Sequence, residues 1–271
     1  LTVTTGPASV SLDAAGAGGM RLFRARVVTE VFHGPFANWL DARRDFGARG
    51  DGISDDTAAL QAALDQVRTN AARPVLYLPA GTYRLTGPLV LRRTGHYDSK
   101  DVMVLGEHPD RTTLRWDGAT GGTMLAFEAW FARLGRLTFD GAGRARTAIT
   151  HGSLFSSANE IHDAVFRDLE FGLEAGRMAG APVAETVVRR CRFVRCARAG
   201  VSLQNFNSLD WFIWDSTFED CGTGVANHFG AGHFHVYRSR FQRSREADLY
   251  IGHTEYFSIR HCWSHGSEAF L

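Results

Sequence analysis

The hydrophobic positions of residues 55–70 recur at helical spacing. Leu60, Leu64 and Val67 fall on one face at i, i+4 and i+7, and alanines widen that face. The preceding segment, Ser54-Asp-Asp56, supplies a capping side chain and then acids at the positive end of a helix dipole. The pattern therefore predicts an amphipathic helix over about residues 55–70 with one buried face.

From residue 75 onwards the pattern changes to short apolar runs separated by polar, glycine-containing turns, which predicts strands. In the second half these strands form a repeat with one aromatic anchor each. The anchors, 22, 25, 23 and 22 residues apart, are Phe171, Phe193, Phe218, Phe241 and Trp263. An apolar residue returns seven or eight positions after the anchor, at Val201, Val225, Leu249 and Phe270.

A repeat of 22–25 residues without helices is typical of a β-solenoid, in which equal positions of successive coils stack ~4.8 Å apart. A leucine-rich horseshoe has a similar period, but its leucine framework is absent from this sequence. An up-and-down barrel would not keep a fixed column of anchors. The pattern therefore predicts an all-β solenoid.

Composition narrows the classes of partner. The chain has 30 Lys+Arg against 29 Asp+Glu, so it lacks the positive excess that general binding to nucleic acid or an anionic membrane needs. No apolar run approaches the ~20 residues of a membrane helix. The four cysteines do not have the spacing of paired zinc motifs. We therefore expect neither nucleic acid nor a membrane as partner, and no resident metal.

The stretch DFGARGDGISDDTAALQAALD (residues 45–65), followed by PVLYLPAGTYRLTGPLVL (residues 74–91), resembles the opening of the pectate-lyase-like superfamily, in particular its rhamnogalacturonase and epimerase-like branch. The resemblance implies a single-stranded right-handed parallel β-helix whose first coil is covered by the helix. It also implies a polysaccharide partner and a secreted or periplasmic location. We expect residues 1–44 to form an N-terminal arm or short strands and residues 45–271 to form the β-helix, which we expect to continue in a longer natural chain.

Three acidic residues of the last coils are the candidate catalytic groups. Glu246 and Glu268 are one repeat apart and both precede alanine, so stacking would bring their backbones ~4.8 Å from each other. Glycosidases need two carboxyl groups ~5 Å apart for retention or ~6.5–9.5 Å apart for inversion. Alternation directs Leu249 inward and Asp248 outward, which adds a third carboxylate. The alternative is a solvated acidic ridge.

A second candidate cluster contains histidine, tyrosine and asparagine. His228 and His253 end equivalent strands of neighbouring coils, close to Asn205 of the coil before, and alternation directs Tyr250 outward beside them. Such groups can orient a sugar or take a proton from it. The alternative is a polar ladder that satisfies the strand ends. Zinc binding by these histidines is less favoured, because the sequence shows no tight ligand pattern.

Aromatic side chains supply a third signal, because flat rings can stack on sugars. Trp211 follows a polar run and is the best candidate for an exposed ring, and Asp210 before it is a further cleft residue. Most of the neighbouring aromatic residues are expected in the core.

These features favour a polysaccharide-active enzyme that cleaves glycosidic bonds by hydrolysis without a cofactor. A polysaccharide lyase that acts by β-elimination on uronic acid polymers, for which calcium is possible, is one alternative. A non-catalytic glycan-binding β-helix is the other. The NTD, GHG and RIK signatures of polygalacturonase-like enzymes and the Asp-Pro-His motif of alginate epimerases are absent from the sequence.

Overall fold

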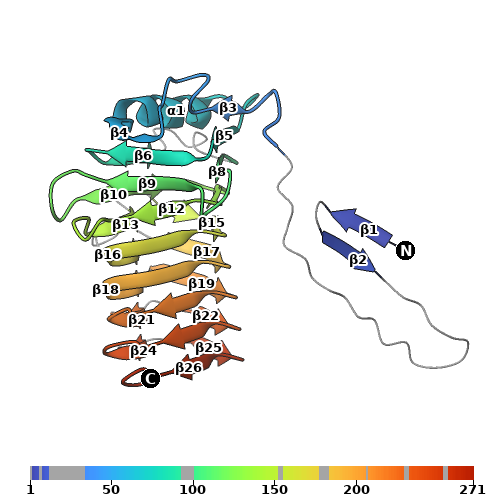
Figure 1. The fold of residues 1–271 in the computed structure, drawn as a ribbon. Coiled ribbons are helices and arrows are strands. Elements are labelled where there is room, and N and C mark those ends of the chain that lie inside the picture. Colours follow the sequence, from blue (N-terminus) through green and yellow to red (C-terminus); the bar gives the residue numbers. More distant parts are fainter. Residues whose placement is uncertain are drawn as a thin grey trace, which may run out of the picture. The chain divides into compact units, whose positions relative to one another are not determined.

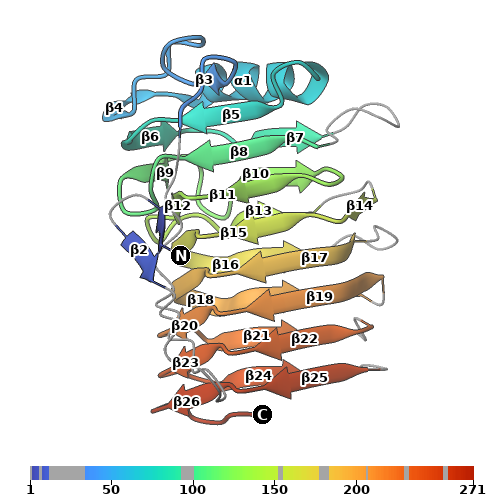
Figure 2. The ribbon, with the colours of Figure 1, turned by 90° about the vertical axis from the view of Figure 1, so that its right-hand side faces the viewer.

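The computed structural model describes residues 2–5, 8–11, 34–92, 101–151, 155–176, 183–205, 207–228, 232–252 and 256–271. Two units make up the chain, Leu1–Ala37 and Asn38–Leu271. In the first, β1 (Thr2–Thr5) pairs antiparallel with β2 (Ala8–Ser11). In the second, helix α1 (Thr57–Thr69) is followed by coils of short parallel strands (Figures 1 and 2).

Each complete coil contributes to three sheet faces, which we call the first, second and third faces. The first face contains β4 (Asp51–Asp55), β6 (Gly81–Leu85), β9 (Thr112–Trp116), β12 (Thr138–Asp140), β16 (Val165–Ala175), β18 (Arg192–Leu203), β20 (Thr217–Glu219), β23 (Arg240–Gln242) and β26 (Trp263–His265). The second contains β7 (Leu89–Arg92), β10 (Thr123–Glu128), β13 (Thr147–Thr150), the later parts of β16 and β18, β21 (Thr223–Asn227) and β24 (Ala247–Ile251). The third contains β3 (Leu40–Asp41), β5 (Val75–Leu78), β8 (Met103–Gly106), β11 (Arg133–Gly135), β14 (Ser156–Ser157), β15 (Glu160–His162), β17 (Val183–Arg189), β19 (Ser208–Trp214), β22 (Phe234–Tyr237) and β25 (Phe257–Arg260).

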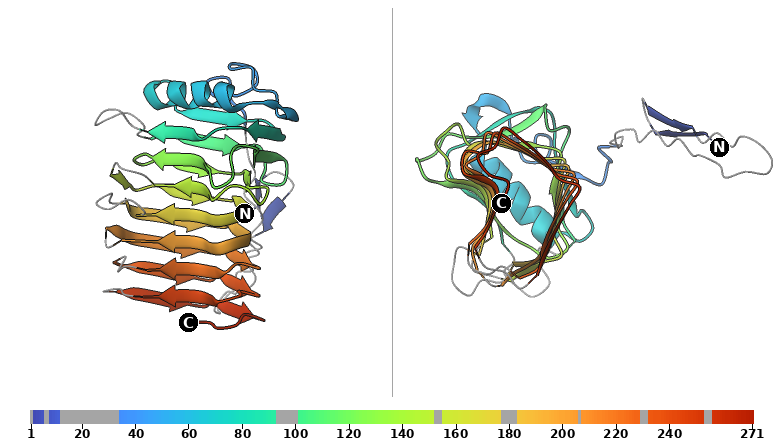
Figure 3. Two further views of the ribbon diagram at one scale, coloured as in Figure 1. Left: turned by 90° about the vertical axis from the view of Figure 1, so that its left-hand side faces the viewer. Right: turned by 90° about the horizontal axis from the view of Figure 1, so that it is seen from below.

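The predicted parallel β-helix with an N-terminal helix is confirmed, and seen along its axis the second unit is a stack of superimposed coils (Figure 3). Stacked rings fill its interior, with neighbouring centroids 4.7–5.3 Å apart. The column consists of Phe139, Phe166, Phe193, Phe218 and Phe241. A second column of apolar residues contains the predicted Val201, Val225 and Leu249.

Two predicted anchors are wrong. Phe166, not Phe171, pairs with Phe193, because β16 is long enough to cross from the first face to the second and Phe171 lies on its later part. At the other end Phe241 pairs with Ser264, and Trp263 lies one position before it with an exposed side chain. The repeat length was recognisable from the sequence, but the register of these coils was not.

Helix α1 covers the first coil as expected, with Leu60, Leu64 and Val67 buried. Gln61 on this helix forms hydrogen bonds with the edge of β7, as a neighbouring strand would. Its amide nitrogen donates to the carbonyl of Val90 at 3.0 Å, and its amide oxygen accepts from the Val90 N–H at 2.8 Å. The helix therefore hides both the apolar interior and the unpaired backbone of the end coil.

The helix begins differently from the prediction. Ser54 belongs to β4, and the N-cap residue is Asp56, whose side chain makes no capping bond. Instead the Asp56 carboxylate accepts the backbone N–H groups of Arg49 and Gly50, at 2.6 and 3.0 Å, and so holds the preceding loop. The Asp55 carboxylate accepts from Thr57 and Thr86.

Both corners that flank the first face are built from left-handed residues of alternating charge. The corner before the first face has Arg136, Asp163, Arg190, Asp215 and Arg238, and the corner after it has Asp168, Arg195, Asp220 and Arg243, with φ between 48° and 60°. Arginines bind the aspartates of the preceding coil with two hydrogen bonds each, as in Arg195–Asp168 at 2.7 and 2.8 Å. Many of the arginines in this chain of near-zero net charge are therefore paired with aspartates at the corners.

Candidate functional site

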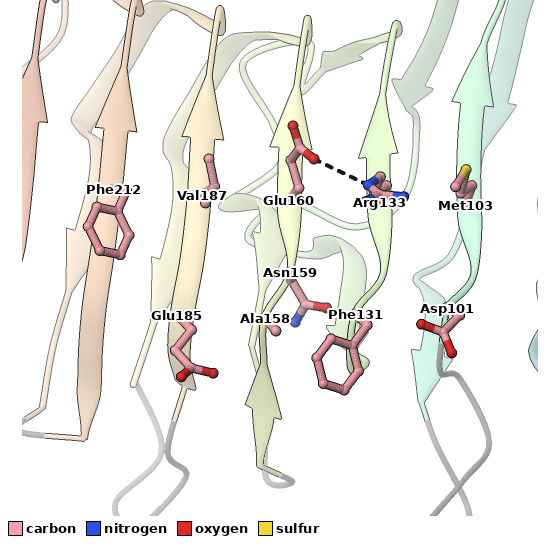
Figure 4. A pocket seen from close by; sticks show the side chains of 10 residues that line it. All are labelled: Asp101, Met103, Phe131, Arg133, Ala158, Asn159, Glu160, Glu185, Val187 and Phe212. Atoms are coloured by element: carbon pink, nitrogen blue, oxygen red, sulfur yellow. Dashed lines mark hydrogen bonds and ion pairs between the residues drawn. The ribbon is translucent and has the colours of Figure 1, made fainter.

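The outer surface of the third face is hollowed into a groove of about 680 Å³ that crosses successive coils (Figure 4). Two rows of side chains line it. One row comes from the strands, with Met103, Arg133, Glu160, Val187 and Phe212 at equivalent positions of β8, β11, β15, β17 and β19. The other row lies two positions earlier in each coil, with Asp101, Phe131, Ala158 and Glu185.

The earlier row owes its direction to the backbone. Asp101, Phe131, Ala158 and Glu185 all have φ between 52° and 57°, in the left-handed region that non-glycine residues rarely adopt. The same conformation continues beyond the groove at Asp210 and His233, with φ of 52° at both. Because the conformation repeats coil after coil, it presents one side chain per coil in a straight row. The same conformation recurs at both charged corners, so it belongs to the turns of this β-helix in general.

Glu160 is fixed at the middle of the groove by two arginines. Its carboxylate lies 3.3 Å from Nε of Arg133 and also accepts from Nε of Arg189. Both arginine charges are thus engaged by one carboxylate. Glu160 is therefore held in position by two arginine contacts.

Glu185 and Asp210 occupy equivalent positions of neighbouring coils, Glu185 in contact with the coil before it and Asp210 with the coil after it. The flanking pairs Ala184–Leu209 and Thr186–Trp211 fix this register. Glu185 is exposed, and its Oε2 accepts a hydrogen bond of 2.5 Å from the hydroxyl of Ser157. Asp210 Oδ1 lies 3.3 Å from Nδ1 of His233 in the next coil. Glu185 thus lines the groove, and Asp210 and His233 continue the same row beyond it.

Beyond Phe212 the same face becomes aromatic. The ring of Phe212 stacks on His235 at 4.9 Å between centroids, and Trp214 stacks on Tyr237 at 6.4 Å. These side chains point outward and are only partly buried. Burial lowers the pKa of His235, so its imidazole is neutral at neutral pH. The groove therefore passes from a charged half to an aromatic half along the axis of the β-helix.

The residues predicted from sequence lie mostly elsewhere. Glu246 precedes β24 at the corner between the first and second faces, where its carboxylate accepts from the Thr223 hydroxyl at 3.2 Å. The backbone of Glu268 runs alongside that segment, with its N–H on the Ser244 carbonyl, so the predicted neighbourhood of Glu246 and Glu268 is present. Their catalytic role remains a prediction, because no observation tests it.

The second predicted cluster is brought together in part. The rings of His228 and Tyr250 lie 5.2 Å apart on the second face, and both side chains are exposed. Burial lowers the pKa of His228 as well. Asn205 lies in the coil before, where its side chain bonds the Gly176 carbonyl and the Asn207 N–H. His253 lies outside the described residues.

Asp248 is not the outward-pointing acid that alternation predicted. Its side chain is fully buried, and neither carboxylate oxygen has a hydrogen-bond partner within the described part of the chain. The reason is a bend of the backbone, which directs two successive side chains into the interior. Its equivalents in earlier coils are Gly200 and Gly224, where an added Cβ would lie 2.6 Å from a ring of the phenylalanine column. The column ends at Phe241, which leaves space for a side chain at Asp248.

Trp211 is likewise buried, with none of its surface exposed, and therefore cannot stack on a sugar. The left-handed Asp210 shifts the phase of alternation, so that Trp211 points into the core while Phe212 and Trp214 point outward. Asp210 itself is partly exposed and follows Glu185 in the row of left-handed residues, and its role in a cleft stays a prediction. Sequence reasoning missed Glu185, although its distance of 25 residues from Asp210 equals one coil.

A metal site finds no support in the geometry. The residues that the structure describes contain no group of three or more His, Cys, Asp or Glu placed to hold an ion. The described cysteines are free, and Cys191, Cys196 and Cys221 are buried. No helix in the described ranges is long and apolar enough to span a membrane.

Comparisons with known proteins agree with the fold. The model of the family described as rhamnogalacturonase A/epimerase, pectate lyase-like, matches residues 39–129. The mannuronan C5-epimerase AlgE1 of Azotobacter vinelandii is 59% identical over 44 residues, which are 16% of this chain and 3% of that relative. The chain thus spans a small part of the curated relatives that it matches.

Two solved structures show the same architecture. The catalytic domain of Agl-KA superimposes with a TM-score of 0.64 at 17% identity, over 90% of this chain and 44% of that one. The phiAB6 tailspike, solved with three-repeated oligosaccharides of Acinetobacter baumannii surface polysaccharide, gives a TM-score of 0.53 at 14% identity, over 82% and 47%. At such identities the likeness concerns the fold alone.

Proposed function

We propose that this chain, which has the pectate-lyase-like parallel β-helix fold, is a polysaccharide-active enzyme that binds a glycan along the groove of its third face and hydrolyses its glycosidic bonds there. The observation that carries the proposal is the pair Glu185 and Asp210, which occupy equivalent positions of neighbouring coils, Glu185 in the lining of the groove and Asp210 next in the same row. A secreted or periplasmic location belongs to the same proposal, because such polymers lie outside the cytoplasm.

The backbone spacing of the pair is compatible with glycoside hydrolysis. Adjacent strands lie ~4.8 Å apart, and side chains that turn towards a sugar from such positions can reach the ~5 or ~6.5–9.5 Å between carboxyl groups that retaining and inverting glycosidases use. In the proposed roles Glu185 donates a proton to the glycosidic oxygen, and Asp210 acts from the other side of the sugar as nucleophile or base. Nδ1 of His233 lies 3.3 Å from Asp210 Oδ1 and can hold this carboxylate in position.

The charge of the groove supports a neutral polysaccharide. Glu160 engages both Arg133 and Arg189, which leaves the charges of Asp101, Glu185 and Asp210 without an arginine partner among the described residues. An excess of carboxylates repels a chain of uronic acids. Because β-elimination and epimerisation act beside a substrate carboxylate, this charge favours hydrolysis over both.

The pair Asp210–His233 supports one alternative. An imidazole beside a carboxylate is the type of group that takes a proton from a sugar carbon, as a lyase requires. In that reaction calcium could offset the negative groove, but the described residues hold no ligand cluster for it. A groove that binds without turnover is the remaining alternative.

The test compares single variants in a reducing-end assay on the polysaccharide that the protein binds. Glu185→Gln and Asp210→Asn are each expected to lower the rate by at least about 100-fold, since general acid and base groups contribute ~10²–10⁴. Binding should persist, because both substitutions keep the shape. Asp110→Asn, at a side chain 72% exposed and far from the row, is the matched control.

A different result would assign the catalytic site to another part of the molecule. If Glu246→Gln removes the activity while Glu185→Gln and Asp210→Asn keep it, the catalytic groups lie at the corner of the second face. In that case the groove proposal is wrong.

A further inference from the structure

A serine, a histidine and a tyrosine form a hydrogen-bonded cluster on the third face, outside the proposed carboxylate pair. Ser258 on β25 has its Oγ 2.8 Å from Nδ1 of His235 on β22. The Tyr237 hydroxyl, two residues along β22, lies 2.6 Å from the same Oγ and 3.4 Å from His235 Nδ1. The two strands pair in register at His235–Ser258, so the contact follows from the fold.

The distances allow an order of protons that suits catalysis. In this order Tyr237 donates to Ser258 Oγ, and Ser258 donates to Nδ1 of His235, which takes the tautomer with its proton on Nε2. A hydroxyl that donates to a neutral imidazole at 2.8 Å has the arrangement of an activated nucleophile and its base. The lowered pKa of His235 agrees with a neutral base.

The surroundings leave the cluster reachable. Ser258, His235 and Tyr237 are all partly exposed on the outer surface. His235 stacks on Phe212, which lines the groove, so the cluster lies at the aromatic end of the same surface. The guanidinium of Arg260 lies 5.7 Å from the centre of the Tyr237 ring and adds positive charge close by.

We propose that Ser258 is the nucleophile of a second activity, the hydrolysis of small acyl esters, with His235 as base and the Tyr237 hydroxyl as donor to the developing oxyanion. The natural substrate class would be an O-acylated glycan, and only this part rests on the proposed function. The ester chemistry itself stands on the cluster.

The steps balance without a further reagent. Ser258 Oγ attacks the ester carbonyl while His235 takes the proton of the Ser258 hydroxyl. The tetrahedral oxyanion accepts a hydrogen bond from the Tyr237 hydroxyl. Collapse breaks the bond to the sugar oxygen, which takes the proton back from His235, and leaves an acyl-serine. His235 then deprotonates a water that attacks the acyl-serine, and the carboxylic acid leaves as Ser258 recovers its proton.

The first experiment asks whether Ser258 reacts. The purified chain is treated with 4-nitrophenyl acetate and, separately, with a fluorophosphonate, and peptide mass spectrometry locates the modified residue. We expect an acetyl group and a phosphonyl group on Ser258. Ser258→Ala should abolish both adducts, whereas Ser264→Ala, at an exposed serine of β26, should keep them.

The second experiment separates a base from a structural partner. His235→Gln is expected to slow 4-nitrophenyl acetate hydrolysis by at least about 100-fold, and Tyr237→Phe by less, with unchanged thermal unfolding. Modification at other serines only, or equal rates in the Ser258→Ala and wild-type proteins, would overturn the proposal. Ser258→Ala should leave glycosidic-bond hydrolysis unchanged, so the two proposed activities fail independently.

Discussion

The imidazole of His151 is fully buried inside the β-helix, edge-on to Phe127 at 5.9 Å and to Trp211 at 5.7 Å. Neither ring nitrogen has a hydrogen-bond partner within the described ranges. Burial lowers the pKa of His151 to about 4 from an ordinary value of 6.5. A side chain held neutral in this way adds a pH-dependent element to the stability of the fold.

The direction of the pH effect follows from proton binding. Between pH 6.5 and 4 the unfolded chain binds a proton at His151 that the folded chain does not, so stability falls as pH falls through this window. At pH 4 the loss relative to pH 7 should approach about 3 kcal/mol. Urea unfolding of His151→Leu should lack this component of the slope. Parallel pH profiles for the two proteins would contradict the assignment.

Particular residues also explain which side-chain positions could not be predicted from the sequence. Alternation predicted the direction of Asp248 wrongly and the polar run before Trp211 predicted its exposure wrongly, because one left-handed residue or one bend inverts the order of inward and outward positions. Asp210 was predicted as a cleft residue, and this role stays a prediction. Glu185, its partner on the neighbouring coil, carries no local signal and becomes visible only when the register of β17 and β19 is known.

At the scale of the strand, the phenylalanine column depends on glycine in the adjacent strand. A Cβ at Gly200 would lie 2.6 Å from the Phe218 ring and 2.8 Å from the Gly224 carbonyl oxygen. We expect Gly200→Ala to destabilise the protein by ~1–3 kcal/mol through overpacking. Gly87→Ala, whose Cβ would meet Thr57 at an ordinary 3.7 Å, is the control. Equal unfolding midpoints for the two variants would show that the column can shift.

The charged corners are a second feature that acts between neighbouring strands and turns. Arg195 and Asp168 pair across one coil, and the hydrogen bonds from Arg195 lower the pKa of Asp168. Arg195→Asp should destabilise the fold by placing like charges opposite each other, and adding Asp168→Arg should restore most of the loss. Because the pair is partly exposed, we expect a coupling below ~1 kcal/mol that weakens with salt. A swap that restores nothing would mean that side-chain shape, not charge, sets the corner.

At the scale of the molecule, the parallel β-helix and the covering helix were both predictable, because amphipathic spacing and repeat length are properties of the sequence. The assignment of residues to the three faces was not predictable. Because the coils vary in length from 23 to 27 residues, similar residues at a regular sequence spacing can lie on different faces. Consequently the sequence directed attention to the corner at Glu246, whereas the groove lies on the third face, where Asp210 and the buried Trp211 are the predicted site residues.

The groove runs across the strands, and this direction suits a polymer that contacts several coils at once. Phe131, with 49% of its surface exposed, lies on the row that leads to Glu185. Phe131→Ala is expected to raise KM for a long glycan several-fold and to leave kcat nearly unchanged, because the ring is remote from the carboxylate pair. A fall in kcat alone would place the reaction at the other end of the groove.

The reaction itself tests the central claim most directly. The protein would be incubated with neutral polysaccharides and with uronic acid polymers, and new reducing ends and ultraviolet absorbance would be followed in parallel. We predict reducing ends from a neutral polysaccharide without an absorbing double bond, and loss of this signal in Glu185→Gln and Asp210→Asn. An absorbing product from a uronic acid polymer, or full activity in both variants, would contradict hydrolysis by this pair.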